Sequence, residues 1–209
     1  MLEYYRERAP VYDRVYRYPE RQVDLQTLSE TVSEYFRGNH VLEIAAGTGY
    51  WTPFIALNAR SVHATDGNDA PLEQLRHRVK TPNVTTQVLD AYDLGSLTQS
   101  FDAAFAGLWL SHVTVQDRPE WLAALHACLA PGAKVMLMDN SEAQCQRLPI
   151  VATDDAGNTF QDRTTDDGQT YRVLKNFPSE SELLNDIGSV QDASYSLLDH
   201  FWCLSYRLR

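Results

Sequence analysis

The sequence is poor in three features that would indicate particular classes of protein. Its 209 residues include only three cysteines, Cys128, Cys145 and Cys203, and their wide spacing matches no CxxC or other metal-ligand pattern. We therefore expect neither a disulfide framework nor a zinc site, and a reducing, cytoplasmic compartment is the natural one. No run of about 18 apolar residues occurs, so neither a membrane span nor an export signal is expected.

Positive charge is also scarce. The chain has 18 Lys and Arg against 28 Asp and Glu, a formal net charge of −10. Nonspecific binding to nucleic acid depends on clustered cations that neutralise phosphates, so a small-molecule ligand is favoured over a nucleic acid. A hydrophobic content of 44% with 22% charged residues is typical of one globular domain, here 1–209. No pattern bears on the oligomeric state.

The most informative stretch is 41–52, where an apolar run ends in a turn with Gly47 and Gly49 and leads into a helix-like segment. The two glycines allow a tight turn and a close approach to a ligand, and the helix start directs its amide groups at that ligand. A dinucleotide site would favour a third glycine or alanine where Thr52 stands, and Glu43 inside the strand also fits it poorly. An NAD-dependent reductase is thus the less favoured alternative.

Two further predicted strands end in acidic residues. Residues 61–65 lead into Asp66, which follows Gly47 by 19 positions, and 84–89 lead into Asp90. An acid about 20 residues after the glycine turn reaches a ribose in nucleotide-binding βαβ units, and the carboxyl ends of parallel strands share one sheet edge. The alternative role for Asp66 is to cap the next helix.

The pattern Glu-x-Ala-x-Gly-x-Gly at 43–49 resembles motif I of the class I S-adenosylmethionine (SAM) methyltransferases, whose commonest form has Gly in place of Ala45. The resemblance implies that this loop packs against the methionine and ribose parts of SAM, that Asp66 binds the ribose and that Asp90 binds the adenine. The implied cofactor-binding residues are Tyr12, Glu43, Ala45, Gly47, Gly49, Asp66, Gly67, Asp90, Ala91, Tyr92 and Gly107.

The same resemblance implies the fold: a single Rossmann-like, doubly wound α/β domain with a seven-stranded mixed sheet. The implied strand order is 3-2-1-4-5-7-6, with the last strand antiparallel. We expect an N-terminal helical arm over 1–37 and a substrate-covering insertion over 141–176. A helix over 50–60 should turn Leu57 inward. Asp117 with Glu120, and Ser179 with Glu182, have the spacing of helix capping boxes.

The N-terminal arm alternates tyrosines with arginines. Its run Arg8-Ala9-Pro10-Val11-Tyr12-Asp13 resembles the arms of small-molecule methyltransferases, in which a tyrosine folds over the cofactor. The resemblance implies that Arg8 and Tyr12 face the amino acid end of SAM. The alternative is that the arm tyrosines simply cover the edge of the sheet.

The segment after the fourth strand carries the candidate catalytic residue. Residues 107–112, Gly-Leu-Trp-Leu-Ser-His, lack the Asx-Pro-Pro-aromatic run of nucleic-acid amino methyltransferases and resemble instead the Phe-x-x-x-His-His-Val run of small-molecule enzymes. His112 is the candidate general base, since histidine accepts protons near neutral pH; the alternative is a structural histidine. Trp109 is a candidate substrate contact. Arg163, Tyr171 and Lys175 could contact an anionic or aromatic substrate; the alternative is that they belong to a solvated hairpin.

The predicted function is SAM-dependent methyl transfer to an oxygen, nitrogen or carbon of a small metabolite. A non-catalytic SAM-binding module is the alternative from another class. Asp139-Asn140 resembles the pair that holds Mg²⁺ in catechol-type methyltransferases, but those enzymes need an Asp where this chain has Gly107. We therefore predict no metal site.

Overall fold

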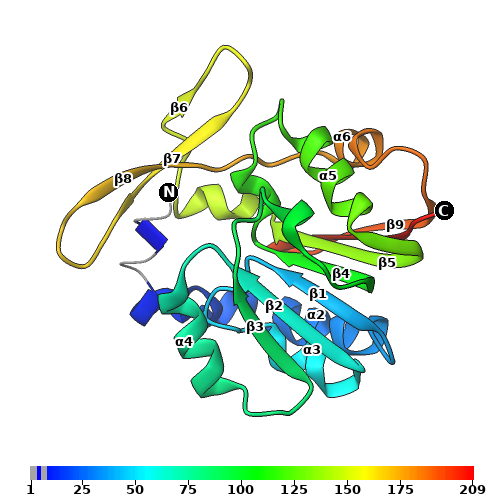
Figure 1. Ribbon diagram of the computed structural model, residues 1–209. Helices are drawn as coiled ribbons and strands as arrows, with labels where there is room; N and C mark the ends of the chain where they lie inside the picture. Colours follow the sequence, from blue (N-terminus) through cyan, green and yellow to red (C-terminus); the bar gives the residue numbers. More distant parts are fainter. Residues whose placement is uncertain (1–3, 6–8) are drawn as a thin grey trace.

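A seven-stranded sheet forms the centre of the molecule (Figure 1). The structure, a computed structural model, describes residues 4–5 and 9–209. The strands are β1 (His40–Ile44), β2 (Ser61–Asp66), β3 (Val84–Val88), β4 (Phe101–Gly107), β5 (Leu129–Asn140), β9 (Gln191–Leu197) and β10 (Phe201–Arg207). Their order is β3-β2-β1-β4-β5-β10-β9, with β10 antiparallel to both neighbours. This confirms the predicted order, and β1 and β4 meet at its centre.

Helices cover both faces of this sheet. The helices are α2 (Gln22–Tyr35), α3 (Thr52–Asn58), α4 (Asp69–Arg78), α5 (Arg118–Ala127) and α6 (Glu180–Asp186). Successive strand residues point to opposite faces, so Val41 packs with the side chains of α2, α3 and α4 and Leu42 with those of α5 and α6. Each face is a continuous apolar layer, as a buried parallel sheet requires.

The prediction that Leu57 turns inward is wrong. Its exposed fraction is 74%, whereas Ile55 is fully buried. The helix α3 has only seven residues, and Leu57 lies about 200° around it from Ile55. Only one side of so short a helix reaches the sheet.

The segment 141–176 contains a small second sheet of its own. It consists of β6 (Ala152–Thr153), β7 (Thr159–Thr164) and β8 (Thr170–Leu174), in that order. Gly157 and Gly168 take positive φ in its two turns, at 85° and 89°, conformations that glycine adopts without strain. Figure 1 shows this sheet projecting from the main one, with β8 on the same side as the N-terminal segment.

The N-terminal segment is made of short 3₁₀ helices before α2. They are η1 (Ala9–Tyr16) and η2 (Pro19–Arg21). Later in the described part of the chain, the 3₁₀ helices are η3 (Leu94–Ser96), η4 (Leu110–His112) and η5 (Glu142–Gln146). Tyr16 stacks on Tyr50, with ring centroids 3.5 Å apart, and Arg14 forms an ion pair of 2.9 Å with Asp166 in the β7–β8 turn. These contacts attach the segment to the glycine loop and to the second sheet. The predicted contact of Arg8 lies outside the described residues.

No helix in the described part of the chain has both the length and the apolar character needed to cross a membrane.

Candidate functional site

Two cavities adjoin each other at the carboxyl ends of β1 and β4, the edge where ligands bind in doubly wound sheets. We call the first the glycine-loop cavity. Its lining residues are Tyr5, Tyr12, Tyr16, Glu43, Ile44, Ala45, Ala46, Gly47, Thr48, Trp51, Asp66, Gly67, Asn68, Pro71, Asp90, Ala91, Phe105, Gly107, Leu108, Trp109 and His112. It therefore gathers nearly all of the predicted cofactor-binding residues.

In the loop between β1 and α3, every second residue from Ala45 to Gly49 has a left-handed backbone conformation. Ala45, Gly47 and Gly49 have φ of 52°, 58° and 74°, which brings the backbone close to the cavity. A Cβ on Gly49 would lie 2.5 Å from Leu75 Cγ in α4, so this glycine allows the loop to pack against that helix. Gly49 itself does not line the cavity, in contrast to its predicted contact with the cofactor.

Asp66 and Asp90 lie at the cavity in different environments. The Asp66 carboxylate accepts hydrogen bonds from the amides of Gly47, at 3.0 Å, and Asn68, at 2.9 Å, and burial raises its pKa. Asp90 is exposed and accepts from the Tyr92 amide at 3.0 Å. Asp66 thus fixes the glycine loop while its carboxylate faces the cavity.

Glu43 is the most deeply buried acid of this cavity, with 1% of its surface exposed. Burial raises its pKa to about 8. Its Oε2 atom has no hydrogen-bond partner among the described residues. Buried polar atoms are almost always paired in a complete site, so this oxygen is available to a donor or a cation on a ligand.

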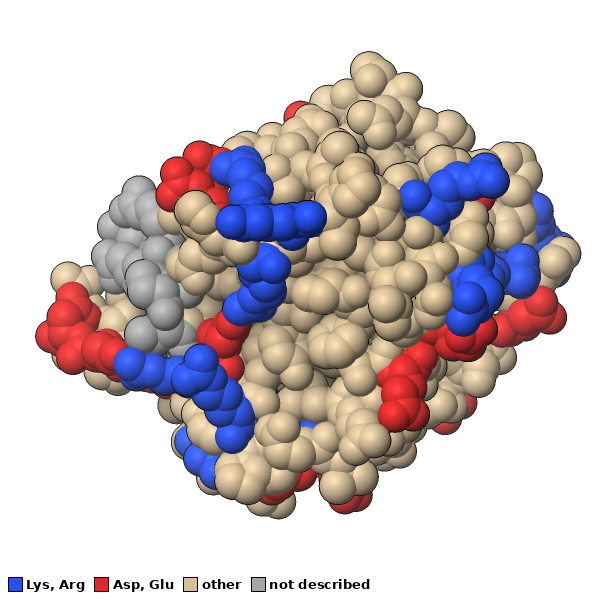
Figure 2. Space-filling view, turned by 90° about the horizontal axis from the view of Figure 1, so that it is seen from below, with Lys and Arg blue, Asp and Glu red and all other residues tan. Residues whose placement is uncertain are grey.

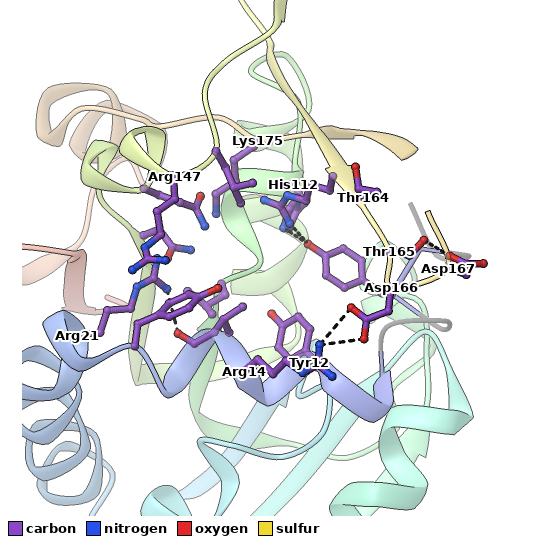
Figure 3. Close-up of a pocket in the computed structure, with 18 residues that line it drawn as sticks. Tyr12, Arg14, Arg21, His112, Arg147, Thr164, Thr165, Asp166, Asp167 and Lys175 are labelled. Carbon is purple, nitrogen blue, oxygen red and sulfur yellow. Dashed lines mark hydrogen bonds and ion pairs between the residues drawn. The ribbon is translucent and has the colours of Figure 1, made fainter. Parts of the chain in front are cut away.

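The second cavity has a volume of about 730 Å³ and is lined by five cationic side chains, so we call it the arginine cavity (Figure 3). The cations are Arg14, Arg21, Arg147, Arg163 and Lys175. They come from η1, η2, the end of η5, β7 and the residue after β8. Among these, the sequence indicated Arg163 and Lys175 as candidate substrate contacts, but not Arg14, Arg21 or Arg147. No spacing pattern connects segments so far apart in the chain.

Four residues line both cavities: Tyr5, Tyr12, Leu108 and His112. Leu108 follows β4 with a positive φ of 60°, which is a strained conformation for a leucine and typical of functional sites. Its amide donates to Met138 O at 2.8 Å, which holds the turn to β5. The shared residues form the boundary across which a group would pass from one cavity to the other.

His112 is buried at this boundary and its tautomer follows from its partners. Nδ1 lies 2.6 Å from Leu174 O, and since a carbonyl only accepts, Nδ1 carries the proton. Nε2 then accepts from the Tyr5 hydroxyl at 2.7 Å, and that hydroxyl accepts from Arg163 at 3.0 Å. Burial, with Lys175 and Arg163 nearby, lowers the pKa of His112 to about 3. The ring is therefore neutral at physiological pH.

A buried ion pair between Lys175 and Asp139 lies near His112. Lys175 Nζ lies 2.6 Å from Asp139 Oδ1 and 2.7 Å from Ser111 Oγ. Burial lowers the pKa of Lys175 to about 8. For Asp139, burial acts to raise the pKa, but Lys175, His112 and the Ser111 amide together outweigh it and the net shift is downward.

Both carboxylate oxygens of Asp139 are engaged inside the protein. Oδ2 accepts from the Ser111 amide at 3.1 Å, and Oδ1 accepts from Lys175 and from the Asn140 amide. Among the described residues, no group of three or more acidic, histidine or cysteine side chains could hold a metal ion. Asp139 is thus a counter-ion of Lys175.

The predicted substrate contacts are distributed differently from expectation. Arg163 lines the arginine cavity, but Trp109 lines the glycine-loop cavity and its ring lies 5.9 Å from that of Tyr92. Tyr92 is half exposed. Tyr171 lines neither cavity, and its ring packs 5.6 Å from that of Tyr4.

The comparisons with known proteins agree with this geometry. A family model described as "Methyltransferase domain" matches residues 41–132. The DhpI–SAH complex is 27% identical with a TM-score of 0.80, covering 99% of this chain and 94% of that one. The DhpI–SAM–HEP complex is 28% identical with a TM-score of 0.77, covering 99% and 95%.

A more distant solved structure shares the fold alone. The N-methyltransferase NodS from Bradyrhizobium japonicum WM9 is 13% identical with a TM-score of 0.62, covering 91% of this chain and 97% of that one. No curated protein matches the chain. The glycine loop, the strand order, the family match and the similar SAM and SAH complexes together support a class I SAM-dependent methyltransferase, an enzyme that uses SAM.

Proposed function

We propose that the glycine-loop cavity binds SAM, that the arginine cavity holds a small-molecule acceptor, and that the methyl group is transferred at their common boundary. The observation that carries this proposal is the wall of four residues that both cavities share, Tyr5, Tyr12, Leu108 and His112. A boundary of single side chains lets two ligands come into contact, and holding them in line is most of what such a transfer requires.

The residues of the glycine-loop cavity fit SAM. Glu43 Oε2, which is buried and unpartnered, suits the ammonium of the methionine part. The Asp66 carboxylate, fixed by two amides, suits two ribose hydroxyls. Asp90 and the amide beside it suit the adenine, and the turn around Gly47 and Gly107 leaves room for the ligand backbone.

When bound, SAM supplies a methyl carbon on a sulfonium: the acceptor's lone pair forms the new bond, and the carbon–sulfur electron pair stays on sulfur to give SAH. His112 has its lone pair on Nε2, where the Tyr5 hydroxyl donates. A hydroxyl or amine of the acceptor that takes that place would give its proton to Nε2. Arg163 and Tyr5 orient the ring and the nucleophile and exclude water.

A small metabolite in the cytoplasm is the acceptor class that the charges favour. The net charge is −10, and on the face in Figure 2 cationic groups lie beside acidic ones around a largely uncharged middle. Such a surface offers no continuous basic track for a phosphate backbone. The residues 141–176, with η5 and the second sheet, supply much of the arginine cavity and so act as a cover over the acceptor.

Calorimetry and a turnover assay test the proposal. SAM and SAH should bind the purified protein and NADH should not. SAH release should then be followed with SAM and a metabolite extract, for the wild type and for His112→Ala. His126→Ala is a matched control, because that histidine bonds to Tyr206 and lines neither cavity. A protein that binds SAM and methylates no component of any extract would be a sensor, contrary to the proposal.

A further inference from the structure

Two of the five cations that line the arginine cavity are buried and have no carboxylate partner among the described residues. Three of the five cations have one: Arg14 pairs with Asp166, Arg147 with Glu20 and Lys175 with Asp139. The other two, Arg21 and Arg163, are only 4% and 7% exposed. Among the described residues, neither lies within ion-pair distance of an acid.

The contacts of these two arginines are neutral. Arg21 donates to Val15 O at 3.3 Å and lies over the rings of Tyr18 and Phe201, at 5.3 Å and 5.5 Å. Hydrogen bonds to a carbonyl and contacts with ring faces satisfy part of the guanidinium's donors. They do not supply a counter-charge.

Arg163, which lies closer to His112 than Arg21 does, also lacks a counter-charge. It donates to the Tyr5 hydroxyl at 3.0 Å and to Gln161 Oε1 at 3.1 Å. Its Nε atom is buried and has no hydrogen-bond partner among the described residues. A buried charge that lacks a counter-ion is costly, so an anion in the cavity would stabilise both arginines.

A third arginine adds to the positive potential. Arg147 lies over the ring of Tyr18 at 4.2 Å, and Arg21 contacts the same ring. Figure 3 shows these two arginines on one side of the cavity, the Arg14–Asp166 pair on the opposite side, and His112 with Lys175 between them. Two guanidiniums at one ring repel each other, and a bidentate oxyanion between them reverses that repulsion.

The concentration of cations here is unusual for the chain. Five of its 18 Lys and Arg residues line this one cavity, while the chain as a whole carries −10. Arginines that merely cover apolar surface keep their charged ends in water. Arg21 and Arg163 are instead buried, and they line a cavity of about 730 Å³.

We propose that the acceptor is a small molecule with an oxyanion group, such as a carboxylate or a phosphate, which Arg21, Arg147 and Arg163 bind in the arginine cavity. The proposal rests on the proposed function in that the anion is the methyl acceptor. The bound oxyanion fixes the acceptor so that its nucleophilic atom reaches the wall shared with the glycine-loop cavity.

The test is calorimetric titration of the full chain, with and without saturating SAH, with three probes at low ionic strength. The probes are inorganic phosphate, acetate and uncharged glycerol. The variants are Arg163→Gln and Arg147→Gln. The control is Arg172→Gln, which removes an exposed arginine of β8 that pairs with Asp162 outside the cavity.

We expect at least one anion to bind the wild type and glycerol not to bind. Arg163→Gln and Arg147→Gln should each weaken anion binding about tenfold or more, since each removes charge-assisted hydrogen bonds, and Arg172→Gln should leave it unchanged. The Arg147 side chain is 53% exposed, so that variant tests the inference even if Arg163→Gln folds poorly.

The inference is overturned if neither anion binds the wild type, or if both cavity variants bind anions as the control does. The affinity for SAH, measured on the same samples, separates this failure from that of the proposed function. Loss of anion binding with normal SAH binding removes only the oxyanion acceptor. A wild type that does not bind SAH refutes the proposed cofactor site, and the titration without SAH still decides the anion question.

Discussion

Binding of SAH should release a proton from Glu43 at neutral pH. Burial raises the pKa of Glu43 to about 8, so at pH 7 about 0.9 of the molecules carry a protonated carboxyl group. The ligand's ammonium beside Oε2 would favour the carboxylate and return the pKa toward its ordinary range. Release should therefore be about 0.9 proton at pH 7, about 0.5 at pH 8 and about 0.1 at pH 9.

The assay is calorimetry of SAH binding in Bis-Tris, imidazole and Tris, whose ionisation enthalpies differ. These buffers are neutral bases or their cations and never anions, so they do not compete with an oxyanion for the arginine cavity. The slope of the binding enthalpy against the ionisation enthalpy gives the number of protons released. Glu43→Gln keeps the shape of the side chain and has no proton to lose, so its slope should be near zero. A wild-type slope near zero at pH 7, or one that the variant retains, would refute the reasoning.

Three further predictions concern single positions. Asp66→Asn should weaken SAM binding more than Asp90→Asn, measured by calorimetry. In the proposed site Asp66 would make two bonds to the ribose, at about 1.5–3 kcal/mol per charge-assisted bond, and it also fixes the loop; equal losses would contradict this. His112→Ala should lower turnover about 10²–10⁴-fold with little change in SAH affinity; near-normal turnover would make it structural. Gly49→Ala should destabilise the fold by about 2–4 kcal/mol in urea unfolding, and clearly more than Gly157→Ala, which has positive φ but open space.

The parts of the fold that were predicted correctly depend on local patterns or on the strand order of the family. Ser179 and Glu182 form the expected capping box, because Ser179 adopts an extended backbone. Asp117 makes no such cap, since its backbone is already helical and its amide donates to Thr114 Oγ1 at 3.1 Å. The spacing of a capping box is the same in both cases, and the preceding turn decides the outcome.

The arginine cavity could not be predicted because nothing in the sequence relates its members. Arg21 and Arg147 are 126 positions apart, and they come together because both contact the ring of Tyr18. Tyr5 bonds to His112 across 107 positions. The sequence could not distinguish it from the other tyrosines of the N-terminal arm. Charge balance reveals such a site only after burial is known for each cation.

The pH dependence of the reaction tests the oxyanion acceptor and the role of His112 together. In the enzyme without acceptor, burial and the nearby charges of Lys175 and Arg163 lower the pKa of His112 to about 3. The ring is therefore neutral above that pH and available as a base. It is then a weak base, because proton transfer is most efficient when the pKa lies near the working pH. An oxyanion beside Arg163 offsets the positive charge at the ring and so raises the pKa of His112 in the complex.

The pKa of His112 before and after the acceptor binds can be measured separately at saturating SAM. The pH profile of kcat/KM reports the pKa values of the enzyme without acceptor, and the profile of kcat reports those of the complex with acceptor. For a carboxylate acceptor, which does not titrate above about pH 5, kcat/KM should be flat from pH 7 to pH 5, because Lys175, whose pKa is about 8, stays protonated in that range. The value of kcat should instead fall within that range, as the pH decreases through the raised pKa of His112 in the complex and the protonated ring can no longer accept. Flat profiles for both quantities would mean that the acceptor's own anionic oxygen is the nucleophile and that His112 only orients Tyr5.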